Sequence, residues 1–346
     1  MTTQPAEIGL PLFERFPGLR EALPRVSLGA WPTPVTGARH FAAAHRLGAL
    51  YVKREDLSHP ECAGNKVRGL EFVIAEAKRR GAKTIVTFST VGSHHIAKTA
   101  WHARRFGIDT VAIVLPQPSA HYVEGNIRTG LAAGARYVPA SYLTLLPKLA
   151  LEMLRARRDG SGGVYYLPAG GSSLPACVGH VSAAFELKRQ IEAGELPEPD
   201  YLYVALGSLG TAAGLLVGCK LAGLRTRLVG VVTSYRWYCT PRRWARLAHR
   251  ITRFMRRLDP SLPETGVTRF DVSVIGTALG RGYARPTDEA TRLMGVFREA
   301  EGIELDSTYT AKTLDGAMQF IDRGRLHGKT HLFWHTYQAP LAEPAV

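Results

Sequence analysis

Between residues 67 and 138, segments with apolar residues at helical spacing alternate with short runs rich in β-branched residues. The expected helices cover 67–80, 95–106 and 121–133, and the expected strands cover 84–88, 110–115 and 135–138. These strands are short, rich in β-branched residues and without apolar–polar alternation, which is typical of strands with both faces covered. The alternation predicts βαβ units around a parallel sheet, and therefore an α/β fold.

Similar segments continue on both sides of this region. Helices are expected at 39–47, 143–158, 177–193 and 288–301, and another follows the turn 207–211 and ends at 221. Strands are expected at 49–53, 164–167, 201–206, 227–232, 271–275 and 332–334. Residues 13–31 are polar and interrupted by prolines, so we interpret them as a lead-in to the folded chain. The sequence contains no internal repeat, heptad pattern or low-complexity tract.

A glycine-led turn places one lysine at the start of the helix expected at 67–80. Gly64 and Asn65 directly precede Lys66. Burial and the positive end of a helix both lower the pKa of a lysine, so its amine can act as a nucleophile. An ordinary helix cap has a similar sequence, so this turn alone leaves both interpretations open.

A second glycine-rich loop follows the strand expected at 201–206 and opens the next helix. Its residues are Gly207, Ser208, Leu209, Gly210 and Thr211. Backbone N–H groups that converge at a helix N-terminus bind phosphate. The spacing does not fit the dinucleotide fingerprint, and the lysine of a nucleoside-triphosphate loop is absent, so a small phosphate monoester fits better. A turn in which the glycines only permit close packing is the alternative.

A hydroxyl-rich turn follows the strand expected at 84–88 and is suited to bind a carboxylate on its backbone N–H groups. Its candidate substrate-binding residues are Ser89, Thr90, Gly92, Ser93, His94 and His95. The serine and the two histidines can also transfer protons, although adjacent histidines often only cap a helix. No metal is expected, because no spacing of metal ligands is present. Tyr283 and Tyr309 each place a phenol in or beside a loop.

Composition limits the class of protein. The chain has 346 residues, of which 45% are hydrophobic, and no run reaches the roughly 18 apolar residues that a membrane span needs. The first nine residues lack the features of a secretion signal, so we expect a cytoplasmic protein. Its four cysteines lie far apart without a C-x-x-C pair, which argues against disulfides and a zinc site.

The formal net charge is +15, and much of the excess lies between Arg225 and Arg257. Within 242–257, Leu247, Ile251 and Phe254 recur at helical spacing while arginines occupy the other face. This pattern predicts a basic amphipathic helix. The helix either covers the core with its charged face in solvent or binds an acidic partner. Nucleic acid is not the expected partner, because no recognisable reading motif is present.

Together these motifs resemble those of pyridoxal-phosphate enzymes of the tryptophan-synthase β-like fold (fold type II), specifically the group of 1-aminocyclopropane-1-carboxylate deaminase and D-cysteine desulfhydrase. The resemblance covers nearly the whole chain. Residues 23–34 match the opening of the family, 52–56 its next block and 64–71 its cofactor-lysine motif.

This resemblance implies two domains, each with a mainly parallel open sheet flanked by helices. The expected large, cofactor-binding domain comprises residues 1–68 and 177–346, and the small domain comprises 69–176. It also implies a homodimer.

The resemblance further implies that Lys66 forms a Schiff base with pyridoxal 5'-phosphate. Other cofactor contacts are implied for Asn65, His94, Gly207, Ser208, Leu209, Gly210, Thr211, Thr310 and Thr336. Ser93, Tyr283 and Tyr309 are the implied catalytic residues beside Lys66, and Asn126 lies in a matching Gly-Asn segment.

Several positions depart from the family pattern. Leu209 replaces a glycine, His94 replaces an asparagine, and Tyr337-Gln338 replaces a Gly-Gly pair, which implies an altered substrate pocket. Thr310 stands where the deaminase has a glutamate facing the pyridine nitrogen, and Thr336 is also neutral. A neutral partner weakens the ring as an electron sink, which suits β-elimination or β-replacement better than cyclopropane opening.

We therefore expect a pyridoxal-phosphate-dependent lyase or deaminase that acts on a small amino acid. As in D-cysteine desulfhydrase, it would release a β-leaving group, ammonia and a 2-oxo acid. β-Replacement and aminocyclopropane-carboxylate deamination are the alternatives with the same cofactor. A basic binding protein with a decayed cofactor site is the alternative from another class.

Overall fold

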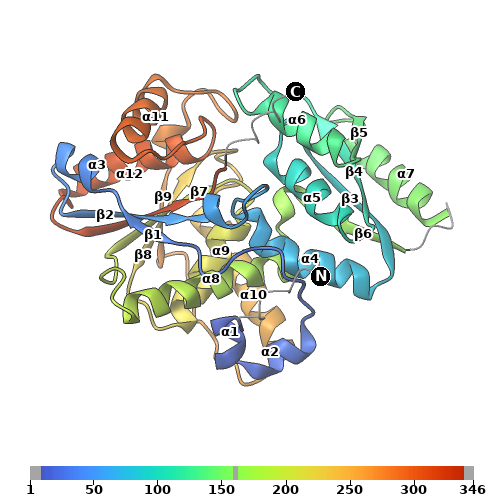
Figure 1. Cartoon of the computed structure of the whole chain (residues 1–346), viewed down its shortest axis with the longest axis horizontal. Coiled ribbons are helices and arrows are strands. Elements are labelled where there is room, and N and C mark those ends of the chain that lie inside the picture. The colour runs from blue at the N-terminus through green and yellow to red at the C-terminus, as the bar shows by residue number, and fades with distance from the viewer. Residues whose placement is uncertain (1–8, 159–162, 339–346) are drawn as a thin grey trace.

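The computed structural model describes residues 9–158 and 163–338, whose strands form two separate sheets (Figure 1). The strands are β1 (Val35–Gly37), β2 (Ala49–Arg54), β3 (Ala82–Thr90), β4 (Asp109–Leu115), β5 (Arg136–Pro139), β6 (Gly163–Leu167), β7 (Tyr201–Leu206), β8 (Arg227–Val232), β9 (Val272–Ile275) and β10 (Thr330–His335). The α-helices are α1 (Pro11–Arg15), α2 (Pro17–Ala22), α3 (Arg39–Ala44), α4 (Lys66–Arg79), α5 (His94–Arg104), α6 (Val123–Ala132), α7 (Leu145–Arg158), α8 (Leu174–Glu192), α9 (Gly210–Leu221), α10 (Pro241–Leu258), α11 (Asp288–Glu301) and α12 (Thr310–Gly324).

The larger sheet has the order β1-β2-β10-β7-β8-β9, and all its pairs except β1 with β2 are parallel. Helices cover both of its faces: α8, α9 and α10 lie on one side, and α3, α11 and α12 lie on the other (Figure 1). Each side has its own hydrophobic core, the first around Trp244 and Trp334 and the second around Phe297 and Phe333. Both faces are therefore buried, as the apolar strands predicted.

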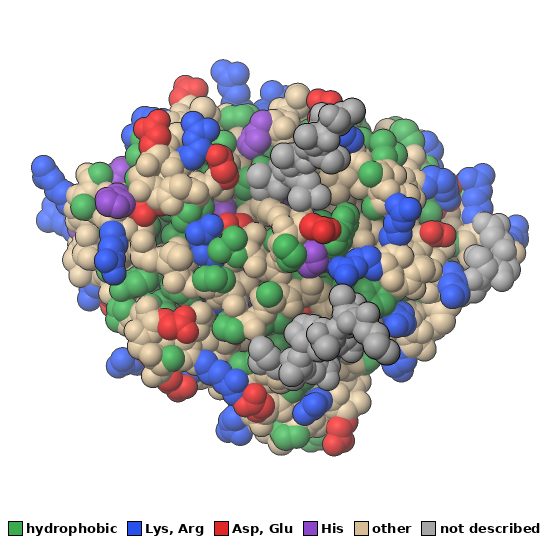
Figure 2. Space-filling model, in the orientation of Figure 1, with side chains coloured by type: hydrophobic (Ala, Val, Ile, Leu, Met, Phe, Trp, Pro, Cys, Tyr) green, Lys and Arg blue, Asp and Glu red, His purple; other side chains and the backbone are tan. Residues whose placement is uncertain are grey.

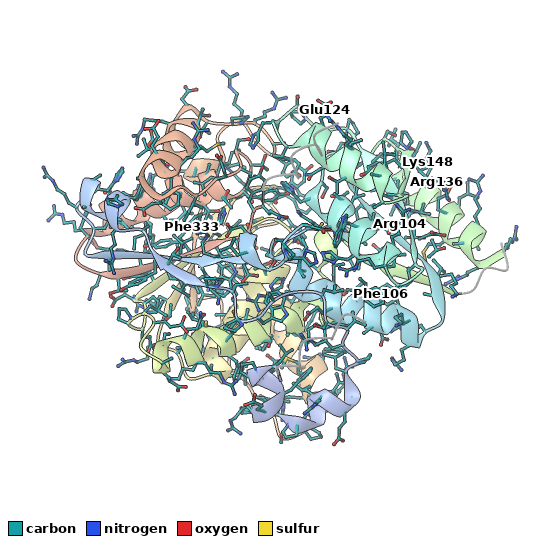
Figure 3. The ribbon with its side chains drawn as sticks, viewed as in Figure 1. Arg104, Phe106, Glu124, Arg136, Lys148 and Phe333 are labelled. Atoms are coloured by element: carbon teal, nitrogen blue, oxygen red, sulfur yellow. The ribbon has the colours of Figure 1, made fainter. Side chains whose placement is uncertain are left out.

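The smaller sheet has the order β5-β4-β3-β6 and is parallel throughout. One of its cores lies against α4 and contains Val73 and Ile85, and another includes Val86 and Ala156 of α7. Arg136 of β5 (Figure 3) forms an ion pair with the buried Glu152, which adds a link from this sheet to α7. All strands of this sheet lie within the range expected for the small domain, whose exact boundaries stay a prediction.

The structure confirms the predicted alternation, with most element ends shifted by one to three residues. The lead-in interpretation of residues 13–31 was wrong for residues 13–22, because most of them belong to α1 and α2. In both helices a proline occupies the first turn, where its missing N–H costs no hydrogen bond. The sequence pattern also failed to predict β1 and α12.

The predicted basic helix is α10, and it packs its apolar face on the core of the larger sheet. Trp244, Ala248, Ile251 and Met255 are buried, whereas most of the arginines are exposed. On the face shown in Figure 2, Lys and Arg side chains are spread around the molecule and acidic groups lie among them. In the described ranges, no helix is long and apolar enough to cross a membrane.

Candidate active site

A cavity of about 760 Å³ lies where the carboxyl ends of strands from both sheets face each other. Its wall includes Lys66, the turn after β3, the loop after β7 and Thr336 after β10. Ligands of open α/β sheets bind outside the carboxyl ends of the strands, so the cavity is in the expected position. Segments far apart in the sequence thus meet at one site.

Lys66 is the first residue of α4, and its side chain is half-buried in this cavity. The turn before it requires a glycine, because Gly64 has a φ of 110° and a Cβ there would lie 3.1 Å from the carbonyl oxygen of Thr336. Burial lowers the pKa of the Lys66 amine to about 8. The uncharged fraction of this amine near neutral pH is therefore far larger than that of an exposed lysine, and this form is able to attack a carbonyl carbon.

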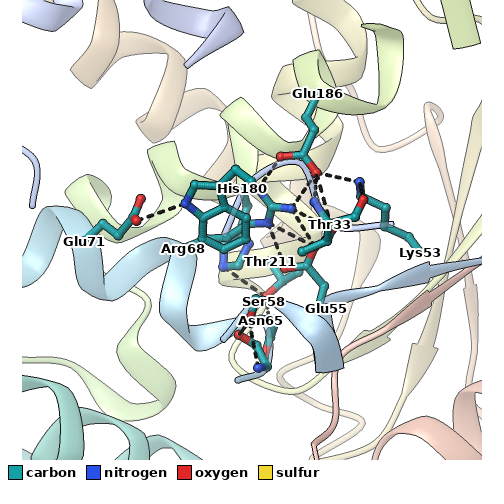
Figure 4. A network of polar contacts seen from close by, with 12 residues as sticks. Thr33, Lys53, Glu55, Ser58, Asn65, Arg68, Glu71, His180, Glu186 and Thr211 are labelled. Atoms are coloured by element: carbon teal, nitrogen blue, oxygen red, sulfur yellow. Dashed lines mark hydrogen bonds and ion pairs between the residues drawn. The ribbon is translucent and has the colours of Figure 1, made fainter. Parts of the chain in front are cut away.

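Two residues after Lys66, the Arg68 side chain joins a buried network of polar contacts (Figure 4). Its guanidinium group donates to Glu55 at 2.7 Å and to Glu186 at 2.9 Å. Glu186 also accepts from the Lys53 ammonium group at 2.5 Å. Trp31 lies against the guanidinium plane, 3.9 Å from ring centroid to Cζ. This network ties the first turn of α4 to β2 and α8, and so fixes the position of Lys66.

The predicted phosphate loop connects β7 to α9 and lines the cavity. Leu209 adopts a left-handed conformation with a φ of 68°, which explains why a glycine suits this position. At Gly210 a Cβ would lie 2.5 Å from Ser172 Oγ, so a larger residue would fill this end of the cavity. Ser172 Oγ donates to Ser208 Oγ at 2.6 Å, and Asn65 Nδ2 donates to Thr211 Oγ1 at 2.8 Å.

His94 lies in the turn after β3 and presents an unpaired hydrogen-bond donor. Asn126 Nδ2 donates to His94 Nδ1 at 2.9 Å, and burial lowers the pKa of the ring to about 4. The ring is therefore neutral and carries its proton on Nε2. This buried nitrogen has no hydrogen-bond partner among the described residues. A ligand oxygen in the cavity would satisfy it.

The neighbouring His95 uses both ring nitrogens within the protein. Its Nε2 lies 2.9 Å from Thr87 Oγ1 and its Nδ1 lies 3.3 Å from Thr99 Oγ1. Burial lowers the pKa of His95 to about 3, so this ring is also neutral. The backbone N–H of His95 donates to Ser93 Oγ, which caps α5. The Ser93 hydroxyl keeps its own proton for donation to a ligand.

Tyr283 and Tyr309 meet in the cavity wall, where their phenol oxygens lie 3.0 Å apart. Tyr283 also contacts Thr90 Oγ1 at 3.2 Å. Burial raises the pKa of both phenols above the ordinary value of 10. Both hydroxyls therefore keep their protons at neutral pH and can donate them.

Ser89 and Thr90 also line the cavity, as the sequence predicted, but two predicted residues do not. The backbone N–H of Gly92 donates to Gln117 Oε1, and its carbonyl oxygen accepts from Asn126 Nδ2. Thr310 is fully buried, and its hydroxyl group donates to Asp306 at 2.8 Å. Contacts of Gly92 and Thr310 with a ligand stay a prediction.

Three charged residues of the cavity wall were missed by the sequence analysis: Lys98, Arg250 and Asp306. Lys98 is only 7% exposed and donates to Gln338 Oε1 at 3.0 Å. Both carboxylate oxygens of Asp306 accept hydrogen bonds at the start of α12. Lys98 and Asp306 lie in no recognisable motif, so no local sequence signal could have identified them. Arg250 lies in the basic segment 242–257, whose pattern does not indicate which arginine reaches the cavity.

A family model described as "Pyridoxal-phosphate dependent enzyme" matches residues 26–336. The chain belongs to this family. Over 325 residues it is 35% identical to nocardicin C-9' epimerase of Nocardia uniformis subsp. tsuyamanensis, with 91% of this chain and 93% of the relative covered. It is 29% identical to D-cysteine desulfhydrase of Salmonella paratyphi B, with coverages of 92% and 94%.

Among solved structures, an ACC deaminase homologue superposes with a TM-score of 0.79 at 25% identity, and the match covers 95% of each chain. The predicted family and two-sheet fold are thus confirmed. The chain is a pyridoxal-phosphate-dependent enzyme, and its cofactor is pyridoxal 5'-phosphate.

Three separate features of the cavity fit this cofactor. The loop 207–211 would hold the phosphate, the unpaired His94 Nε2 would donate to the ring oxygen, and Lys66 would form the Schiff base. The bound cofactor supplies an electron sink that weakens the bonds at the α-carbon of an amino acid. The surrounding residues bind and orient the reactants and move protons.

Replacing His94 with phenylalanine should weaken cofactor binding while keeping the ring packing on Tyr122 and Tyr337. The variant loses one donor, worth about 0.5–1.5 kcal/mol, so the Kd should rise about two- to tenfold. Absorbance titration of the cofactor-free chain measures this Kd. His121→Phe, which alters an exposed ring outside the cavity wall, should leave it unchanged. An unchanged Kd in His94→Phe would refute the assigned contact.

Cofactor binding to the cofactor-free chain should speed up with rising pH and level off above about 8. The uncharged amine of Lys66 is the reactive form, and its pKa lies below the ordinary 10.5 because of burial. The growth rate of the visible absorbance band, measured between pH 6 and 10, checks this. A rate that still climbs at pH 10 would show that Lys66 titrates like an exposed lysine.

Proposed function

We propose that this enzyme catalyses β-elimination on an amino acid, with Lys66 as the base that removes the α-proton. One observation carries the proposal: a lysine of lowered pKa shares a cavity with two neutral, hydrogen-bonded phenols. The lysine is suited to accept a proton, and a phenol is suited to give one to the leaving group.

The roles of the other residues follow from their positions. The turn 89–95 binds the α-carboxylate, with Ser93 as a hydroxyl donor, and Lys98 adds a buried amine to the same cavity. Tyr283 or Tyr309 protonates the β-substituent as it departs. In balance, the substrate loses hydrogen from Cα and the β-substituent from Cβ, and water converts the remainder into a 2-oxo acid and ammonia.

Thr336 in the cavity wall supports elimination, because it offers a neutral partner to the pyridine nitrogen. Epimerisation at the α-carbon is the second candidate, and the 35% identity to nocardicin C-9' epimerase favours it. The two reactions share the removal of the α-proton by Lys66. They differ in the next event, which is departure of the β-substituent or return of a proton to the other face.

One assay series separates these reactions. The holoenzyme is incubated with single enantiomers of cysteine, serine and alanine, and the 2-oxo acid, ammonia and the opposite enantiomer are quantified. Release of the 2-oxo acid and ammonia from cysteine or serine supports elimination, whereas conversion of enantiomers without release supports epimerisation. If neither release of a 2-oxo acid nor conversion of enantiomers is seen with these substrates or with larger amino acids, both proposals are contradicted.

The protein is further proposed to be a cytoplasmic homodimer. Its four cysteines are free and buried, which supports a reducing compartment. Light scattering after size exclusion measures the mass directly. A mass near 37.8 kDa, that of one chain, would contradict the dimer.

A further inference from the structure

The cavity continues outward from the cofactor residues to aromatic side chains at the surface. Tyr235 and Trp237 line it, yet their side chains are 43% and 68% exposed. Large exposed aromatic residues beside a cavity commonly mark a binding surface. A short amino acid next to Lys66 would leave this outer part of the cavity unused.

The outer rings are continuous with the inner phenols. The ring centroids of Tyr309 and Tyr283 lie 6.1 Å apart, and those of Tyr283 and Tyr235 lie 6.5 Å apart with ring planes 22° from parallel. Trp237 follows at 6.2 Å from Tyr235. These four residues form an aromatic wall, which runs from the reacting groups to the surface.

Several contacts hold the outer half of the aromatic wall in place. Ser234 Oγ donates to the carbonyl oxygen of Gly207 at 3.2 Å, and Cys239 Sγ donates to that of Leu206 at 3.1 Å. Both ends of the segment 235–238 are thereby tied to the phosphate loop. A rigid, preformed surface of this kind loses little conformational entropy when a ligand binds.

Two further contacts fix the rings themselves. The Arg243 guanidinium group lies 5.4 Å from the ring centroid of Trp237, in a cation–π contact. The hydroxyl of Tyr235 lies 3.2 Å from that of Tyr142, which precedes α7 beside the smaller sheet. Tyr235 therefore links the two sheets at the mouth of the cavity.

Resting on the proposed function, we infer that the substrate is an amino acid whose β-substituent carries an aryl group that packs on the aromatic wall. Tyr and Trp offer large, rigid faces that stack on aromatic ligands. The position of Trp237 at the outer end requires a substituent longer than the thiol of cysteine. An arylmethyl thioether of cysteine has this shape, and its β-carbon would remain at the phenols.

The test compares two thioethers, S-benzylcysteine and S-methylcysteine, each in both enantiomers. Rapid mixing with the holoenzyme yields the Kd from the change in the cofactor absorbance before turnover. We expect S-benzylcysteine to bind about tenfold more tightly, a difference of ~1.4 kcal/mol. In Trp237→Ala this preference should fall to about twofold or less. Tyr235→Phe, which keeps the ring, should retain it.

Phe270→Ala is the matched control, because Phe270 is also a highly exposed aromatic residue but lies outside the cavity wall. It should bind both thioethers like the wild type. Equal affinities in the wild type, or a preference that survives in Trp237→Ala, would overturn the inference. So would a dimer that Trp237→Ala splits into monomers, because the aromatic wall would then be a subunit contact.

Failure of the proposed reaction gives a different result. If the holoenzyme prefers S-benzylcysteine but releases no 2-oxo acid from it, the aryl specificity is supported and the elimination reaction is contradicted. If it eliminates from S-methylcysteine and shows no preference for S-benzylcysteine, the elimination reaction is supported and the aryl specificity is contradicted.

Discussion

The Lys66→Ala variant is expected to lose the visible absorbance band of the Schiff base and at least about a thousandfold of the turnover. Lys66 is the only lysine besides Lys98 among the described residues of the cavity wall, and Lys98 donates to Gln338. A positioned acid–base residue alone contributes about 10²–10⁴-fold. Absorbance of the purified variant and a product assay measure both losses.

Lys312 is the control for Lys66, because its pKa is also lowered but it does not line the cavity. Burial lowers its pKa to about 8, as in Lys66, but its ammonium group donates to the carbonyl oxygens of Leu279 and Gly282 at 2.9 Å each. Lys312→Gln should keep the absorbance band, because glutamine can still donate to these carbonyls. A band that persists in Lys66→Ala would contradict the assignment of the Schiff-base lysine.

The fold was largely predictable because its central strands are buried on both faces. The strand β7 is a continuous apolar run, β8 is apolar after its first residue, Arg227, and the predicted ends of both match the structure. By contrast, α12 begins with Thr310 and contains two further β-branched residues, Thr313 and Ile321, which lower its local helix propensity. Asp306 stabilises its start by accepting backbone N–H groups of residues 308–310. Tertiary packing, which no local pattern encodes, completes this helix.

For the active site, the sequence revealed the motifs but not the groups that complete the cavity. Lys66 and the phosphate loop have local signatures, namely glycines where the backbone must turn sharply at a helix start. Lys98 and Asp306 lie in ordinary helical or loop sequence. They become site residues only because distant segments bury them together.

Three of the departures from the family pattern, His94, Tyr337 and Gln338, line the cavity wall. The rings of His94 and Tyr337 lie 5.3 Å apart between centroids, and Gln338 accepts the hydrogen bond of Lys98. The sequence showed each of these departures separately, whereas the structure brings His94 and Tyr337 into contact.

The Arg68→Met variant should lose about 3–5 kcal/mol of unfolding free energy, since it leaves two buried carboxylates without their main partner. Glu55 and Glu186 are both nearly inaccessible to solvent, and methionine preserves volume but no charge. Urea unfolding followed by circular dichroism measures the difference. The control is Arg292→Met, which removes the exposed ion pair with Glu289. This substitution should lower the free energy of unfolding by less than about 1 kcal/mol.

The pH dependence distinguishes lost charge pairing from lost packing in Arg68→Met. Burial tends to raise the pKa of Glu186, but Arg68 and Lys53 outweigh it and hold the pKa at about 2, below the ordinary 4.5. A depressed carboxyl pKa contributes stability above pH 4.5 that is lost as the pH falls toward 2. The difference in unfolding free energy between wild type and variant should therefore be largest near neutral pH and shrink below 4.5. A difference that stays constant down to pH 3 would show that packing, and not the charge of Arg68, stabilises the first turn of α4.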